Sequence, residues 1–344
     1  MDKRKLPVWA LVLADLAAAA ICVGLVLLVL YVIPQGTKVE QTEETAVTQF
    51  ALPSEGSGVD LGITAASQND WSHADTLSIA ADQEEIEQFL AVKKTRETLQ
   101  EYAGTTSEIK IEQVSCTVNG EPLVYYTADI YVSTIQAVQT AFADNMYGKN
   151  IRSFVSTMAK ENHAILAISG DSYGESDSAC VIRNGVLYDS DPGTSDVCVL
   201  FRDGVMKTYS ASQFDAEAVM EQGAWQAWTF GPALLDGNGG IPEAFHSTEY
   251  LNKINPRAAI GYVAPGHYKF VVVDGRQEDY SAGVTMNQLA ALMQEEGCMT
   301  AYNLDGGKSA VMVYDGKQVS QPIGAGRTIS DIIYIGEVKQ EVQK

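Results

Sequence analysis

Four dipeptides in which Asn or Asp precedes Gly constrain the fold of this chain most strongly. They are Asn119-Gly120, Asn184-Gly185, Asp203-Gly204 and Asp315-Gly316. Each lies between short runs in which apolar residues alternate with polar ones. Because Asn, Asp and Gly tolerate the positive φ angles of tight turns, each dipeptide predicts a turn between two antiparallel strands. The sequence therefore predicts a domain built largely from hairpins.

Two segments with helical spacing interrupt the predicted strands. The first covers about residues 151–162. The second begins at Thr285, has Gln288 in the capping-box position and stops at Gly297. Hairpins with a few inserted helices predict an α+β domain with a mixed or antiparallel sheet, covering residues 106–340.

The N-terminal region contains a long apolar segment. Residues 8–33 are almost continuously apolar, with Asp15 as the only charge, and they are long enough to cross a bilayer as a helix. Three basic residues at positions 3–5 precede this segment, so residues 1–7 are expected in the cytoplasm. A cleaved signal peptide is the alternative, although the apolar run exceeds a signal h-region. We therefore expect a single-pass protein of the cell membrane, anchored in the lipid bilayer, with an extracellular C-terminal domain.

Residues 34–105 are expected to form an extracellular stalk. Their N-terminal part is rich in Thr, Ser, Gly, Gln and acidic residues and has few apolar clusters. Within this region, residues 84–102 combine helical spacing with many charges, which predicts an exposed helical segment of the stalk. An amphipathic helix packed on the domain is the alternative interpretation.

Composition restricts the partners and the redox chemistry. A formal net charge of −21 argues against nucleic acid and means that an anionic substrate needs local basic residues. With four histidines and no Cys-x-x-Cys spacing, a zinc site is not expected. Four cysteines follow the apolar segment, which allows either two disulfides or free buried thiols. They are Cys116, Cys180, Cys198 and Cys298.

Four polar, glycine-bearing segments follow apolar runs. They begin at Ser169, Trp228, Asn255 and Tyr302, and a short Asp274-Gly275-Arg276 segment follows the third. Taken singly, each is ordinary turn chemistry. The last segment is the most informative, because Asn303 and Asp305 lie directly before Gly306 and Gly307. Glycine has no Cβ, so a carboxylate and an amide stand where another molecule can approach the backbone closely.

Taken in order, these segments resemble the phosphodiester glycosidase family. The motifs are Asn255-Pro-Arg-x-Ala-Ile-Gly, Asp274-Gly-Arg, Ser281-x-Gly-x-Thr and Tyr302-Asn-Leu-Asp-Gly-Gly. The resemblance covers roughly residues 125–337 and excludes the apolar segment and the stalk. Three positions depart from the family pattern, where Ser169, Ala258 and Lys308 replace Asn, Thr and Gly.

The resemblance implies a glycosidase-type hydrolase of carbohydrate metabolism. Its expected reaction is cleavage of a sugar-1-phosphodiester linkage, of the N-acetylglucosamine-1-phosphodiester kind, in a cell-surface or exported glycan. A phosphorylated glycan or glycopolymer, such as an exopolysaccharide, is the expected substrate. The reaction requires stabilisation of an oxocarbenium-like centre, a nucleophile or a base for water, and donors for the phosphate.

Two aspartates and two arginines are the leading candidates for this chemistry. Asp171 and Asp305 are the candidate catalytic carboxylates, and the sequence does not assign their roles. Arg257 and Arg276 are candidate phosphate ligands, because a guanidinium fork matches two phosphate oxygens. A structural ion pair of Arg257 with Asp305 or Asp274 is the alternative. The remaining substrate-binding candidates are Asn303, Gly306, Gly307, Thr229 and Gly231, with backbone N–H groups of the glycine loop as anion donors.

The sequence also allows different assignments of these residues. No cofactor is required, but a divalent cation, calcium or magnesium, would suit Asp171 and Asp305 because they offer hard oxygen ligands. A non-catalytic module for glycan binding or exopolysaccharide assembly is a second interpretation, and a cation-dependent phosphodiesterase is a third. Arg327 is a secondary phosphate candidate, and Trp225 and Trp228 fit a sugar-stacking wall or, more commonly for tryptophan, the core. The hydrolase hypothesis requires both aspartates and both leading arginines to converge on one site.

Overall fold

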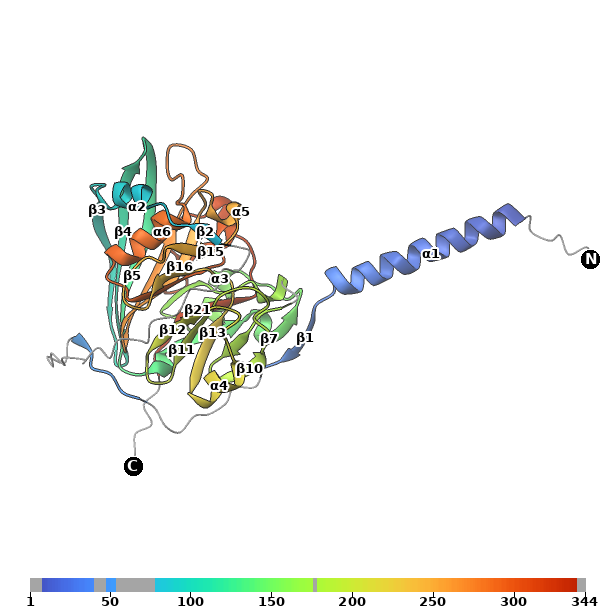
Figure 1. Ribbon diagram of the computed structural model, residues 1–344. Helices are drawn as coiled ribbons and strands as arrows, with labels where there is room; N and C mark the ends of the chain where they lie inside the picture. The colour runs from blue at the N-terminus through green and yellow to red at the C-terminus, as the bar shows by residue number, and fades with distance from the viewer. Residues whose placement is uncertain (1–7, 40–47, 54–77, 176–177, 339–344) are drawn as a thin grey trace, which may run out of the picture.

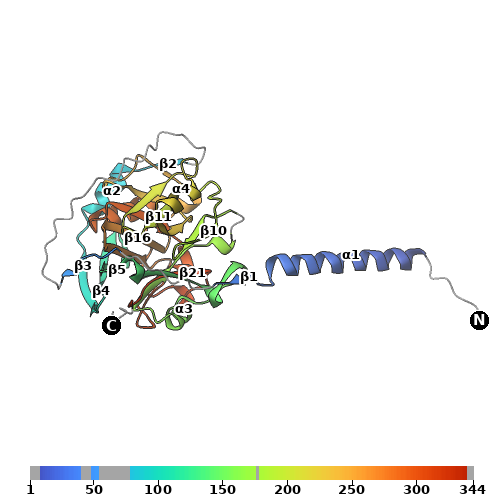
Figure 2. The same cartoon turned by 90° about the horizontal axis from the view of Figure 1, so that it is seen from below.

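The computed structural model describes residues 8–39, 48–53, 78–175 and 178–338. The apolar N-terminal segment forms α1 (Val8–Tyr31), which projects from a β-rich body in both views (Figures 1 and 2). Large apolar side chains of α1, such as Leu16 and Ile21, are exposed. Within the described ranges, no helix meets the length and hydropathy required to cross a membrane.

The largest sheet has seven antiparallel strands. Their order is β14 (Ala233–Asp236), β18 (Thr300–Leu304), β16 (Arg257–Ala264), β17 (His267–Val273), β5 (Glu121–Val132), β4 (Ser107–Val118) and β3 (Thr95–Ala103). On one face, α2 (Gln83–Leu90) and α6 (Met286–Glu295) lie side by side (Figure 1). Apolar residues such as Phe89, Val271 and Leu289 join the helices to the sheet in one buried cluster. Burial on this face therefore fixes the position of β18.

Two five-stranded sheets complete the body. One has the order β10 (Val186–Asp189), β9 (Val181–Arg183), β13 (Ala224–Trp228), β11 (Val197–Phe201) and β12 (Met206–Tyr209). The other has the order β20 (Lys317–Gln318), β19 (Met312–Tyr314), β8 (Leu166–Ser169), β21 (Asp331–Ile335) and β6 (Val138–Phe142). Ile130, Trp228 and Ile333, one from each of the three sheets, belong to the same buried cluster. The three sheets thus share a core, and their strand ends meet.

Short elements complete the fold. They are β1 (Gln35–Lys38), β2 (Ser78–Ala80), β7 (Met146–Lys149), β15 (Ala244–His246), α3 (Val155–Glu161), α4 (Ala216–Glu221) and α5 (Glu249–Asn252). β1 pairs with β7, and β2 pairs with β15. Parts of the expected stalk therefore contact the body, while its residues 40–47 and 54–77 lie outside the described residues.

The hairpin predictions are confirmed. Asn119-Gly120 joins β4 to β5 with φ angles of 52° and 86°, and Asn184-Gly185 joins β9 to β10 with 51° and 79°. Asp315-Gly316 joins β19 to β20 in the same conformation, and Asp203-Gly204 lies between β11 and β12. The described body is mostly antiparallel sheet with several helices, as the alternating patterns predicted.

The helix predictions have mixed outcomes. Thr285 caps α6 through the predicted capping box. The helix predicted for 84–102 is wrong in its second half, because α2 ends at Leu90 and residues 95–103 form β3. β3 is an edge strand that is exposed along most of its length. Its residues are therefore mostly polar and do not show the alternation of apolar and polar residues that marks a half-buried strand. The helix predicted for 151–162 is shorter, because Ser153 bridges to Ile329.

Candidate active site

The end of β18 carries two of the predicted residues. All five residues of β18 are buried, and Asp305 follows directly with a relative exposure of 6 %. Asn303 Nδ2 donates a 2.6 Å hydrogen bond to the carbonyl oxygen of Gly231. The Oδ1 atom of Asn303 is buried and has no hydrogen-bond partner among the described residues. The strand therefore presents an unused acceptor and a carboxylate at one corner.

The Asp305 carboxylate pairs with Arg327, which was only a secondary candidate in the sequence. Arg327 Nη2 lies 3.3 Å from Oδ1 and 3.0 Å from Oδ2 of Asp305. Arg327 Nε donates to Ser309 Oγ at 2.9 Å, which fixes the guanidinium plane. Burial raises the pKa of Asp305, while a hydrogen bond to Ser309 and the charge of Arg327 oppose this rise. Because the Arg327 side chain is 41 % exposed, the pair is open to solvent on one side.

Asp171 is held more rigidly than Asp305. Its Oδ1 accepts from the backbone N–H of Ser172 at 2.7 Å, and its Oδ2 accepts from the N–H of Thr229 at 2.7 Å. Asp171 is 2 % exposed, and burial raises its pKa. Its two carboxylate oxygens are thus engaged within the protein, and Thr229 contributes through its backbone.

The two aspartates are brought together through the backbone. The N–H of Asp305 donates to the carbonyl oxygen of Gly170 at 3.2 Å, and Ser169 Oγ donates to the carbonyl oxygen of Asp305 at 3.3 Å. The first and last of the polar segments therefore adjoin through their backbones. Ser169, which departs from the family pattern, takes part in this junction.

A buried arginine that the sequence analysis did not single out supports Asp171. Arg183 Nε donates to Asp331 Oδ2 at 2.7 Å, and its Nη2 lies 3.7 Å from Asp171 Oδ2. Asp331 Oδ1 accepts from the Asp171 N–H at 2.7 Å. Burial raises the pKa of Asp331 to about 6; the negative charge of Asp171 adds to this rise, and the positive charge of Arg183 opposes it. An arginine directly after the apolar pair Val181-Ile182, at the end of β9, is the sequence signal that could have indicated this network.

The glycine loop after Asp305 packs tightly. A Cβ on Gly306 would lie 2.8 Å from the carbonyl oxygen of Pro256, and Gly307 has a φ of 61°. The N–H of Gly307 donates to the same carbonyl at 2.9 Å, so it is already engaged within the protein. The loop therefore needs glycine for close packing, and Gly307 does not offer the anion donor that was expected.

The two predicted arginines differ in their surroundings. Arg276 is exposed, donates to Asn255 and has Nη1 3.6 Å from the position of a Cβ on Gly307. Arg257 is buried and donates to backbone carbonyls, including that of Lys253 at 2.7 Å. Burial and the nearby charge of Arg276 lower the pKa of Arg257 to about 10. Arg276 thus lies beside the glycine loop, whereas the Arg257 guanidinium joins the backbone at Lys253 to that at Val284.

Packing fixes the roles of several further side chains. The alternative considered for Arg257, an ion pair with Asp305 or Asp274, is not formed: Asp305 pairs with Arg327, and Asp274 accepts from Tyr280 and Gln321. Both tryptophans of β13 lie in the buried core. The cysteines are free thiols. In the described ranges, no cluster of three or more His, Cys, Asp or Glu side chains is arranged to hold a metal ion.

Comparison with known families agrees with this site. The model of the phosphodiester glycosidase family matches residues 162–336, which include Asp171, Asp305 and Arg327. The chain belongs to the phosphodiester glycosidase family. The resemblance inferred from the spaced motifs is therefore confirmed, and the family is one of hydrolases.

Two similar proteins add detail. The chain is 30 % identical over 232 residues to the SPbeta prophage-derived uncharacterized protein YomE of Bacillus subtilis (strain 168), covering 61 % of this chain and 36 % of that protein. The chain thus spans about a third of the length of this relative. The zebrafish N-acetylglucosamine-1-phosphodiester alpha-N-acetylglucosaminidase catalytic domain, auto-inhibited by its pro-peptide, has a similar fold. The two structures superpose with a TM-score of 0.55 and have 21 % sequence identity. The match covers 80 % of this chain and 96 % of that domain.

Proposed function

We propose that this protein hydrolyses a sugar-1-phosphodiester of the N-acetylglucosamine-1-phosphodiester kind, with Asp305 as the carboxylate that meets the sugar. The observation that carries this proposal is the solvent-open Asp305–Arg327 pair at the end of β18. Family membership and the fold shared with the zebrafish enzyme support it. A carboxylate beside a cation suits a substrate in which an anomeric carbon is bonded to a phosphate oxygen.

The proposed reaction breaks the bond between the sugar C1 and the phosphate oxygen. Asp305 acts at C1, either as the nucleophile or as the base that takes a proton from the attacking water. The phosphate monoester leaves with the bonding electron pair, and the sugar gains a hydroxyl group at C1. Because phosphate is a good leaving group, cations that hold its charge matter more than an acid that protonates it.

Two arginines are proposed to hold that phosphate. Arg327 contacts Asp305 directly, and Arg276 lies beside Gly307 on the loop that follows. Both guanidinium groups reach solvent, so they can contact phosphate oxygens from their open side. Arg257 is assigned a positioning role instead, because its donors are spent on backbone carbonyls.

Asp171 is also assigned a positioning role. Backbone N–H groups of Ser172 and Thr229 occupy its two oxygens, and Arg183 neutralises it from the buried side. These contacts hold the segment after β8 against β9 and the end of β13. Asn303 is buried, and we propose that it positions the end of β18 through the hydrogen bond from its Nδ2 to Gly231.

We further propose, from the apolar sequence of residues 8–33, that this segment anchors the protein in the cell membrane, with the body outside the cell. Basic residues before α1 and the exposed apolar side chains along it support this proposal. A cell-surface or exported phosphorylated glycan would then be the natural substrate, since tethering raises its effective concentration. Protease digestion of intact cells tests this orientation. Loss of the body from intact cells is the expected result, and full protection would contradict it.

The activity is tested with the full chain in detergent micelles. The substrate is an α-N-acetylglucosamine-1-phosphodiester, with and without calcium or magnesium, and free sugar is measured. We expect the native protein to release free sugar and the Asp305→Asn variant to release none. The Asp315→Asn variant, a control at a surface hairpin, should release sugar as the native protein does. A cation requirement would appear as release only when calcium or magnesium is present. No release from this or any other sugar-1-phosphodiester by the folded protein would overturn the proposal.

A further inference from the structure

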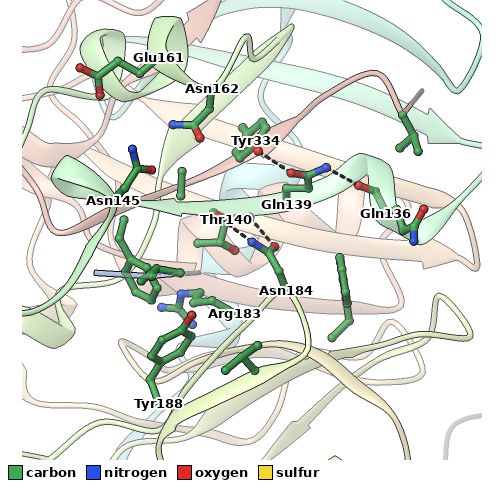
Figure 3. A pocket seen from close by; sticks show the side chains of 16 residues that line it. Gln136, Gln139, Thr140, Asn145, Glu161, Asn162, Arg183, Asn184, Tyr188 and Tyr334 are labelled. Atoms are coloured by element: carbon green, nitrogen blue, oxygen red, sulfur yellow. Dashed lines mark hydrogen bonds between the residues drawn. The ribbon is translucent and has the colours of Figure 1, made fainter. Parts of the chain in front are cut away.

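A cavity of about 520 Å³ lies between the strand β6 and the β9–β10 hairpin (Figure 3). None of the candidate residues around Asp305 lines it. Its walls come from β6, the end of α3, the β9–β10 hairpin and β21. We propose that this cavity binds an uncharged saccharide unit, at a site separate from the one around Asp305.

The lining is rich in side-chain amides. The amides are those of Gln136, Gln139, Asn145, Asn162 and Asn184. Each amide carries both a donor and an acceptor, as each sugar hydroxyl group does. A set of amides can therefore pair with several hydroxyl groups without requiring a charge on the ligand. The volume falls within the range of about 300–1,000 Å³ that is usual for small-molecule sites.

One part of the wall is fixed by internal hydrogen bonds. Asn184 accepts from the N–H of Thr140 at 3.0 Å and donates to its carbonyl oxygen at 2.9 Å. Gln139 Nε2 donates to the carbonyl oxygen of Gln136 at 2.8 Å, and its Oε1 accepts from the hydroxyl of Tyr334. The cavity is thus held in shape before any ligand enters, which reduces the entropy lost on binding.

Another part of the wall carries side-chain amides whose donors and acceptors are not all paired. The side-chain amides of Gln136 and Asn145 have no partner among the described residues. Asn162 Nδ2 donates to the carbonyl oxygen of Met158 at 2.8 Å, which leaves its Oδ1 unpaired within the same part of the chain. Figure 3 shows these three side chains around the cavity. They are the groups that a ligand would contact.

The charges favour an uncharged ligand. Arg183 is 1 % exposed and pairs with Asp331, so its charge is compensated inside the protein. The remaining formal charge in the lining is Glu161, which is exposed and would repel a phosphate. Tyr188 adds ring surface that can cover the apolar face of a sugar. A neutral polyhydroxylated molecule matches this combination better than an anion does.

The test measures binding of neutral disaccharides to the full chain in detergent micelles. The probes are maltose, cellobiose and N,N′-diacetylchitobiose, followed by saturation-transfer NMR and calorimetry. The double variant Gln136→Ala/Asn145→Ala removes two amides that hold no other element in place. Asp305→Asn serves as the matched control at the other site. Thermal unfolding of both variants verifies that the fold is retained.

We expect at least one disaccharide to bind, with an affinity about tenfold or more weaker in the double variant and unchanged in Asp305→Asn. That factor corresponds to the loss of two hydrogen bonds. Binding that is lost in Asp305→Asn but retained in the double variant would place the sugar in the hydrolase site and overturn the proposal. No binding of any probe at 10-millimolar order, roughly the weak limit for such ligands, would also overturn it. These outcomes do not depend on whether Asp305 supports hydrolysis.

Discussion

The backbone N–H of Asp305 donates a 3.2 Å hydrogen bond to the carbonyl oxygen of Gly170, the residue immediately before Asp171. This bond joins the end of β18, in the seven-stranded sheet, to the end of β8, in a different sheet. Segments more than 130 residues apart in the chain thus form one corner. The position of Asp305 therefore depends on two sheets, so changes in either should alter activity.

The glycine loop provides the first test of this dependence. In Gly306→Ala, the new Cβ would lie 2.8 Å from the carbonyl oxygen of Pro256, a backbone atom that cannot move alone. We expect the loop to shift and kcat to fall by about 10–100-fold, since misplacement by about 1 Å has effects of that order. Sugar release and the unfolding temperature are measured together. Gly24→Ala in α1, where a Cβ meets nothing within 4 Å, is the control. Unchanged kcat would contradict the proposed packing requirement.

Removal of Arg327 should change the pH dependence of activity. Burial already raises the pKa of Asp305 and the charge of Arg327 opposes that rise, so Arg327→Ala should raise the pKa further. Asp305 must be ionised to act as nucleophile or base, so the acidic limb of the kcat/KM profile should move to higher pH, by about one unit or more. KM should also rise if Arg327 holds phosphate. Arg327→Lys should shift the limb less, and an unmoved limb in Arg327→Ala would exclude the pairing as a determinant.

The buried network around Arg183 should dominate the stability of this corner. Arg183→Met leaves Asp171 and Asp331 without their cation, which should lower the free energy of unfolding by about 3–5 kcal/mol. Carboxylates with raised pKa values favour the folded state at low pH, and this contribution is lost as pH rises through the folded-state value. With the pKa of Asp331 at about 6, the loss should be smaller at pH 5 than at pH 8. Urea unfolding at both pH values measures this, and equal losses would contradict the account.

The cap of α6 is a purely structural test. Thr285 accepts from the Gln288 N–H at 3.2 Å and donates to Glu85 of α2 at 2.8 Å. Thr285→Ala should therefore lower the free energy of unfolding by about 1–2 kcal/mol. Activity per folded molecule should stay unchanged, because the Thr285 hydroxyl contacts Gln288 and Glu85 and not the residues around Asp305. Thr285→Ser should restore most of the stability. A loss of activity without a loss of stability would show that the helix acts on the site.

Local features were the ones that the sequence could predict. The Asn-Gly turns and the Thr285 capping box depend on a few neighbouring residues, and the structure contains them. The sequence of β3 indicates helix, but its conformation comes from pairing with β4 rather than from its own polar residues. Propensity and periodicity cannot reveal a pairing that tertiary contacts impose.

The candidate site could be predicted in part. Asp305, Asn303 and the glycines are identifiable because polar residues beside Gly at a strand end form a local pattern. The side chains that pair with Asp305 and Asp171 could not be identified from the sequence. The sequence motifs point to Arg257 rather than Arg327 as a phosphate ligand. In the structure, Arg257 donates to backbone carbonyls, and Arg327 contacts the Asp305 carboxylate. Such pairings join distant parts of the chain, so no local spacing encodes them.

Isotope labelling tests the central claim most directly. The full chain would hydrolyse an α-N-acetylglucosamine-1-phosphodiester in water enriched in oxygen-18, and both products would be analysed by mass spectrometry. If Asp305 directs attack at the sugar C1, the released phosphate monoester carries no label and the new oxygen is on the sugar. Label in the phosphate would show that the phosphorus–oxygen bond is cleaved, and would contradict glycosidase chemistry at this site.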